Sequence, residues 1–75
     1  MTYQNRLKAL REDHDLNQTK VAEVLNVSQI TYSQYERGVR ELKIEQLKML
    51  CEFYGVSSDY VIGLPKDLDY PERWK

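Results

Sequence analysis

Apolar residues recur at intervals of three and four positions along most of this chain, and no segment alternates apolar and polar residues with a period of two. The first spacing keeps apolar side chains on one face of an α-helix, whereas the second is typical of a half-buried β-strand. The sequence therefore predicts an all-α protein.

Residue types that favour helix ends divide this pattern into five segments. Short polar side chains stand where four of the segments begin, and glycines stand where three of them end. The predicted N-caps are Thr2, Asn17, Ser28 and Ser57, and the predicted stops are Gly38, Gly55 and Gly63, with a further stop near Asn26. The predicted inward residues of the first four helices, in order, are Tyr3, Leu7 and Leu10; Val21, Ala22 and Leu25; Thr31 or Tyr32, and Tyr35; and Ile44, Leu47, Leu50, Cys51 and Tyr54. A short fifth helix is predicted around Tyr60, Val61 and Ile62.

The 75 residues fit one compact bundle of five short helices over residues 1–64, followed by an extended tail over residues 65–75 that contains Pro65 and Pro71. Charged residues at 31% and hydrophobic residues at 41% are ordinary for a soluble globular protein. Neither a run of 18 apolar residues nor a secretory leader pattern is present, so we expect no membrane partner and a cytoplasmic location.

Catalysis has little support in the sequence. The single histidine, His14, lies among acidic residues and is predicted to be a solvated helix end, and the single cysteine, Cys51, falls at an apolar helix position. No glycine-rich phosphate loop, nucleophile and base pair, or set of metal ligands is visible. We therefore expect no catalytic residue, no metal, no cofactor and no small-molecule ligand.

The segment at 27–43, VSQITYSQYERGVRELK, predicts a helix whose outer face carries amides, a hydroxyl and an isoleucine. A turn of about three residues separates this helix from the one before it, which is the spacing of a helix-turn-helix motif. The second helix of that motif enters the DNA major groove, where glutamine matches the adenine edge and an apolar group can contact the thymine methyl. The candidate base-reading residues are Gln29, Ile30, Ser33 and Gln34.

Contacts to the DNA backbone are expected around the same helix. Backbone N–H groups at helix N-termini and exposed cations bind phosphates. Residues 1–43 carry a net charge of +1 and residues 44–75 a net charge of −2, a mild asymmetry of the sign expected for a polyanion-binding N-terminal half. The candidate phosphate-binding residues are Gln18, Ser28, Arg37, Arg40 and Lys43.

Three stretches resemble the Cro and phage-repressor class of helix-turn-helix domains, often called the XRE family: LRE at 10–12, LNQTKVAEVLNVSQITYSQYERG at 16–38 and LKMLCEFYGVSSDYVIGL at 47–64. The resemblance implies a lambda-repressor-like bundle of five helices over residues 3–63. It also implies the base and phosphate roles given above, and a partly buried ion pair between Arg11 and Glu36. The chain departs from the class at Tyr32 and Tyr35, which are usually aliphatic, and at residues 42–43, where a proline and a serine or threonine cap are usual.

The expected function is that of a transcriptional regulator, a repressor that binds double-stranded DNA as a homodimer on an inverted-repeat operator. The candidate dimer surface comprises Tyr60, Ile62, Leu64, Leu68, Tyr70 and Trp74. The tail could instead fold back over its own core. An alternative function is that of an antitoxin or another protein-interaction module that keeps the fold and holds a protein partner through the tail.

Overall fold

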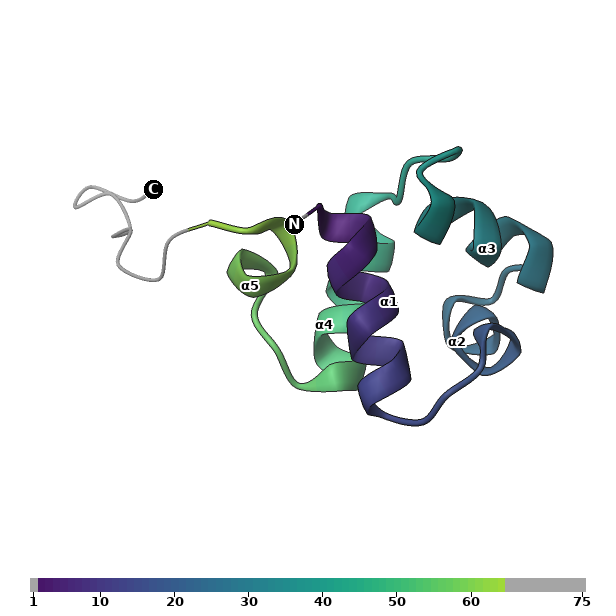
Figure 1. Cartoon of the computed structure of the whole chain (residues 1–75), viewed down its shortest axis with the longest axis horizontal. Coiled ribbons are helices and arrows are strands. Elements are labelled where there is room, and N and C mark those ends of the chain that lie inside the picture. Colours follow the sequence, from purple (N-terminus) through teal and green to yellow (C-terminus); the bar gives the residue numbers. More distant parts are fainter. Residues whose placement is uncertain (1, 65–75) are drawn as a thin grey trace.

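The computed structural model describes residues 2–64, and over this range the chain forms five helices and no strand (Figure 1). The helices are α1 Tyr3–Asp13, α2 Gln18–Leu25, α3 Gln29–Arg37, α4 Ile44–Tyr54 and α5 Ser58–Ile62. The all-α prediction is therefore confirmed. The predicted tail at 65–75, with Leu68, Tyr70 and Trp74 of the candidate dimer surface, lies outside the described residues.

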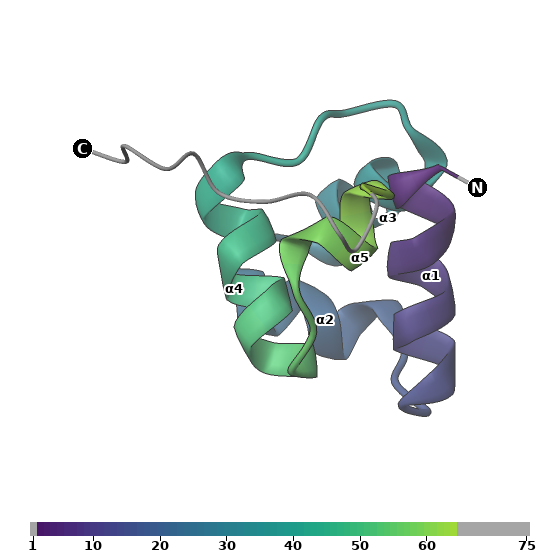
Figure 2. The same ribbon diagram turned by 90° about the vertical axis from the view of Figure 1, so that its left-hand side faces the viewer.

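The helices are arranged so that α2 and α3 lie at one end of the described molecule and α5 lies at the other (Figure 1). Figure 2 shows α5 between α1 and α4, and it contacts both. Helix α3 packs on α1 and α2, while α2 also contacts α4. The outward side of α3 and the outward side of α5 therefore face away from each other.

Side-chain caps begin four of the helices, as predicted. At each of these starts a hydroxyl or amide oxygen accepts the backbone N–H three residues later, which satisfies a donor that the helix itself leaves free. The bonds run from Asn5 N to Thr2 Oγ1 (3.2 Å), Lys20 N to Asn17 Oδ1 (2.9 Å), Thr31 N to Ser28 Oγ (3.1 Å) and Tyr60 N to Ser57 Oγ (3.3 Å).

Helix α4 begins in a different way, because Lys43 has no side-chain oxygen to offer. Instead, Gln46 in the first turn reaches back, and its Oε1 accepts the Lys43 backbone N–H at 2.9 Å. This is one half of a capping box. The other end of the same amide, Nε2, donates to the Tyr35 hydroxyl at 3.0 Å, so the start of α4 is also fastened to α3.

Helices α2 and α3 each end at a residue with left-handed backbone, Asn26 and Gly38. Asn26 closes α2 with φ 57°, and Gly38 closes α3 with φ 77°. Both residue types adopt this conformation more readily than others, glycine because it lacks a Cβ atom. After Gly38 the chain turns back, and the Val39 backbone N–H bonds the Gln34 carbonyl at 3.0 Å.

The core is formed by apolar and aromatic side chains from all five helices. Tyr32 and Leu50 are fully buried, and Tyr32 rather than Thr31 is the inward residue near the start of α3. Nine of the ten buried hydrophobic residues were among those predicted to face inward from helical spacing in the first four helices, and Val61 completes the set from α5. The buried set is Leu7, Leu10, Val21, Ala22, Leu25, Tyr32, Tyr35, Leu50, Tyr54 and Val61.

One inward prediction is wrong. Ile44 is 80% exposed, although the α4 spacing placed it with Leu47 and Leu50. It lies at the first turn of α4, beside an open apolar groove that Ile62 also lines, and no helix of the described residues covers it. Cys51 is half-buried against the core, and burial raises the pKa of its thiol.

His14 is exposed, as predicted, but it is not simply solvated. Its Nδ1 lies 2.8 Å from the Leu10 carbonyl oxygen, and its ring packs at 5.0 Å, centroid to centroid, against Tyr54 of α4. The histidine therefore covers the end of α1 rather than standing free in water, because Tyr54 from a distant segment is brought beside it.

Candidate nucleic-acid interface

The turn between α2 and α3 consists of residues 26–28, which is the length predicted from sequence. The left-handed Asn26 lets the Val27 backbone N–H bond back to the Ala22 carbonyl at 3.0 Å. Val27 is half-buried and packs against the core. This short, anchored turn fixes the direction of α3 relative to α2, as a helix-turn-helix motif requires.

The outer face of α3 carries the candidate base-reading residues. Gln29 and Ile30 are exposed, Ile30 at 67%, while Ser33 and Gln34 are half-buried. Tyr32 and Tyr35 point the other way, into the core. Amides, a hydroxyl and an isoleucine thus form one polar and apolar strip along the solvent side of the helix.

Behind this strip lies a partly buried ion pair. Arg11 of α1 donates to the carboxylate of Glu36 from Nε at 2.7 Å and from Nη2 at 3.1 Å. The side chains of Arg11 and Glu36 are only 12% and 3% exposed. A third donor of the same guanidinium, Nη1, bonds the Leu16 carbonyl at 2.9 Å. The pair therefore joins α1, the segment before α2, and the last turn of α3.

The ion pair continues outward through two glutamines to the solvent side of α3. Gln18 Nε2 donates to Glu36 Oε1 at 3.1 Å, and Gln29 Nε2 donates to Gln18 Oε1 at 2.7 Å. Because a carboxylate only accepts, the Gln18 nitrogen must face Glu36 and its oxygen must face Gln29. Gln29 in turn must donate, which leaves its own oxygen free to accept from a ligand. Sequence reasoning placed Gln18 and Gln29 at the same surface but missed this chain of bonds.

The candidate phosphate-binding residues surround the same helix. Gln18 lies in the first turn of α2, and the Ser28 hydroxyl is used as a cap that also donates to Thr31 Oγ1 at 2.9 Å. Arg37, Arg40 and Lys43 are exposed at or after the end of α3. Arg40 reaches back to α3, where its Nε donates to Gln34 Oε1 at 2.9 Å. Sequence reasoning did not anticipate that link.

Two forces oppose each other at Glu36. Burial disfavours its charged form, but hydrogen bonds from Arg11 and other neighbours outweigh burial, so the pKa of the Glu36 carboxyl lies below its ordinary value. Tyr32 is close to the same carboxylate, although its buried hydroxyl has no hydrogen-bond partner of good geometry within residues 2–64. Burial, reinforced by Glu36, raises the pKa of Tyr32, and burial raises that of Tyr54 to about 12, so both phenols are neutral.

The low pKa of Glu36 predicts a loss of stability in acid. A group whose pKa is depressed by folding contributes stability above its unfolded pKa, about 4.3 for glutamate, and this contribution is lost as pH falls through the folded pKa. We expect the free energy of unfolding of the wild type to fall more steeply than that of Glu36→Gln between neutral pH and about pH 3. Urea titrations followed by circular dichroism at several pH values measure this, and parallel pH dependences would contradict it.

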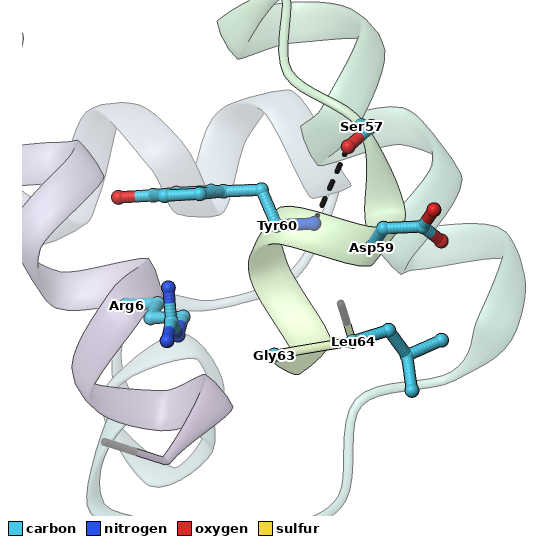
Figure 3. Close-up of a pocket in the computed structure, with 6 residues that line it drawn as sticks. All are labelled: Arg6, Ser57, Asp59, Tyr60, Gly63 and Leu64. Carbon is cyan, nitrogen blue, oxygen red and sulfur yellow. Dashed lines mark hydrogen bonds between the residues drawn. The ribbon is translucent and has the colours of Figure 1, made fainter. Parts of the chain in front are cut away.

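At the opposite end of the described molecule, α5 and the segment after it expose three large apolar residues. Tyr60, Ile62 and Leu64 are each about half exposed, at 46%, 47% and 45%. Figure 3 shows Tyr60 facing Arg6 of α1, and the Arg6 guanidinium carbon lies 5.2 Å from the centre of the tyrosine ring. This contact orients Tyr60 at the junction of α1 and α5. The described half of the candidate dimer surface is therefore continuous with α1.

Over residues 2–64, no group of three or more histidine, cysteine, aspartate or glutamate side chains is placed to hold a metal ion. None of the helices in that range is both long enough and apolar enough to cross a membrane. The two residues considered for chemistry have packing roles: His14 packs on Tyr54 of α4, and Cys51, in α4, packs against the core.

A helix-turn-helix family model matches residues 7–61. Among curated proteins, the chain is 39% identical over 54 residues to the cryptic phage CTXphi transcriptional repressor RstR of Vibrio cholerae, covering 72% of this chain and 49% of that protein. It is 30% identical over 69 residues to antitoxin PezA of Streptococcus pneumoniae, covering 92% of this chain and 44% of that protein. The chain thus spans about half the length of these relatives.

A solved structure supports the same likeness. The P22 c2 repressor protein, crystallised in complex with a synthetic operator, superposes with a TM-score of 0.75 at 27% sequence identity. The match covers 83% of this chain and 94% of that chain. The five-helix arrangement described above is therefore shared with a protein whose structure was determined on DNA.

Proposed function

This chain belongs to the helix-turn-helix family of Cro and phage-repressor-like domains, and we propose that it binds double-stranded DNA sequence-specifically and regulates transcription, as a repressor. One observation carries the proposal: the solvent side of α3 bears amides and an exposed isoleucine, and a buried ion pair holds the helix that displays them. Acting on DNA places the protein in the cytoplasm, at the nucleoid.

The base contacts come from the outer face of α3, laid in the major groove. Gln29 offers a free amide oxygen and one remaining N–H, which match the N6 amino group and N7 of adenine. Ile30 can contact a thymine methyl, and that role accounts for its exposure. Ser33 and Gln34 lie one turn further along and reach the following base pairs.

The backbone contacts come from both sides of α3. Gln18 and Ser28 stand near the N-termini of α2 and α3, where free N–H groups and the positive end of the helix dipole attract phosphate. Arg37, Arg40 and Lys43 supply positive charge beyond the C-terminus of α3. These contacts position the protein on the duplex, whereas the base contacts select the sequence.

Two copies of the chain bind one operator. The described part of the dimer surface lies at the end of the molecule opposite α3 and consists of exposed apolar side chains on and just after α5, Tyr60, Ile62 and Leu64. Leu68, Tyr70 and Trp74 extend this surface in the proposal. Two recognition helices related by a two-fold axis read half-sites about 34 Å apart, so the operator is an inverted repeat.

A binding selection from a randomised DNA duplex library, at near-physiological salt, tests the proposal. The expected result is an enriched inverted repeat with half-site centres about one helical turn apart. Enrichment of a single half-site would support sequence reading but contradict dimeric binding. Equal recovery of all sequences by a folded sample would overturn the proposal.

Replacing Gln29 with alanine tests its role directly. The side chain is exposed, so we expect Gln29→Ala to keep the fold and to lower affinity for the selected duplex by about tenfold, since a bidentate base contact is worth about 1–3 kcal/mol. Affinity for an unrelated duplex should change little. Fluorescence anisotropy with both duplexes gives the two affinities, and Asn5→Ala, an exposed change on α1, is the control. An equal loss on both duplexes would show that Gln29 does not read a base.

The likeness to antitoxin PezA favours a second candidate function, a module whose main partner is a protein. In that case the helix-turn-helix fold is kept while residues 65–75 hold the partner. Deleting these residues would then abolish a stable protein complex and leave DNA binding intact. Loss of DNA binding on the same deletion would instead favour the dimeric repressor.

A further inference from the structure

Arg40 and Gln34 form a bonded pair on the DNA-facing side of the protein. Arg40 Nε donates to Gln34 Oε1 at 2.9 Å, and the Arg40 backbone N–H donates to the Gln34 backbone carbonyl at 3.3 Å. The left-handed Gly38 turns the chain so that both contacts form. The arginine is thus fixed beside the glutamine by main chain as well as side chain.

The pair fixes the orientation of the Gln34 amide. A guanidinium only donates hydrogen bonds, so the amide oxygen must face Arg40 and the NH₂ group is left for a ligand. Gln29 is fixed in the opposite sense, because the chain from Glu36 through Gln18 uses its nitrogen and leaves its oxygen free. Two amides on one helix therefore present different groups to the groove.

We propose that Arg40 is a positioning residue that sets which base Gln34 reads, favouring guanine or thymine over adenine. This inference rests on the proposed function, because it specifies part of the operator that α3 selects. Guanine offers N7 and O6, and thymine offers O4, as acceptors for the free NH₂ group. Adenine offers only one acceptor, N7, beside its N6 amino donor, and that donor needs the amide oxygen.

The second lone pair of the Gln34 oxygen does not restore adenine reading. It lies beside the Arg40 cation, whose positive charge repels another donor. The remaining N–H groups of the Arg40 guanidinium are further donors, and the group has no acceptor to offer. The Gln34 and Arg40 pair therefore behaves as a donor surface, whereas a free glutamine would serve as donor and acceptor alike.

The test uses five proteins in the duplex selection: wild type, Gln34→Ala, Arg40→Met, Arg40→Lys and Arg37→Met. The base pair opposite Gln34 is identified as the position whose preference is lost in Gln34→Ala. Arg37 is the matched control, because it is an exposed arginine at the same end of α3 and makes no bond to Gln34 within residues 2–64. Circular dichroism establishes that each variant is folded.

Wild type is expected to favour guanine or thymine over adenine at that position by about tenfold, the value of one good base contact. Arg40→Met should bring adenine to within about twofold, while Arg40→Lys, which keeps a donor, retains most of the preference. Arg37→Met should lower the affinity for all sequences alike and reduce the slope of log affinity against log salt concentration by about one.

Three results would overturn the inference. They are a wild type that favours adenine at this position, an Arg40→Met variant that behaves like Arg37→Met, and an Arg40→Lys variant that behaves like Arg40→Met. If one of these results occurs and the selection still enriches an operator, the inference fails but the proposed function does not. No enriched sequence at all, from folded wild type, overturns the proposed function itself.

Discussion

Glu36→Ala is expected to lower the free energy of unfolding by about 3 to 5 kcal/mol, because it leaves the Arg11 guanidinium buried without its counter-charge. Arg11 is only 12% exposed, and two of its donors bond Glu36. A core of this size supplies about 3 to 5 kcal/mol in total. The variant should therefore be largely unfolded, which urea denaturation and circular dichroism measure, and it should lose DNA binding for that reason.

The double variant Arg11→Met with Glu36→Leu separates the effect of leaving a buried charge unpaired from the effect of changing the shape of the side chains. Replacing a buried ion pair by apolar residues of similar volume is often neutral or stabilising. We expect the double variant to recover most of the stability lost in Glu36→Ala. If Glu36→Ala instead unfolds at the wild-type urea concentration, the ion pair does not hold α1 to α3.

Leu50→Ala is expected to cost about 2 to 5 kcal/mol, because it removes buried methyl groups and leaves a cavity that the helices fill only in part. Leu50 is fully buried at the centre of α4, where it joins a core built from all five helices. Urea denaturation again measures the effect: the midpoint should fall while the slope of the unfolding free energy against urea concentration stays constant.

Ile44→Ala is the matched control for Leu50→Ala. It also truncates an aliphatic side chain on α4, but Ile44 is 80% exposed. Changes at exposed sites of this kind are usually within about 0.5 kcal/mol. Equal destabilisation by the two variants would mean that Ile44 is covered in solution, as it would be if a second copy or the segment after residue 64 occupied the groove beside it.

Helix boundaries could be predicted from this sequence because they depend on local chemistry. Ser28 and Asn17 cap the next turn, and Gly38 takes up a left-handed backbone, whatever the rest of the chain does. Burial is different, since periodicity identifies one face of a helix without saying whether another element covers all of it. Ile44 was misplaced for this reason: its face of α4 opens onto a groove.

The strip of residues on α3 could likewise be read from spacing, but the bonds behind it could not. Gln18 and Glu36 are 18 positions apart, and Arg40 meets Gln34 only because Gly38 reverses the chain. Such links depend on tertiary placement and leave no periodic signal. The pair of Arg11 and Glu36 was suggested by resemblance to a family, and the structure shows it at 2.7 Å.

The two amides of α3 are bonded to partners that differ in how much the fold depends on them, and this difference bears on how the protein can evolve. Gln29 is tied through Gln18 to Glu36, a residue on which folding depends, whereas Gln34 is tied to an exposed arginine. Lineages that adapt to an altered operator are therefore free to change positions 34 and 40 first. Positions 11, 18 and 36 should stay constant among descendants that bind quite different DNA.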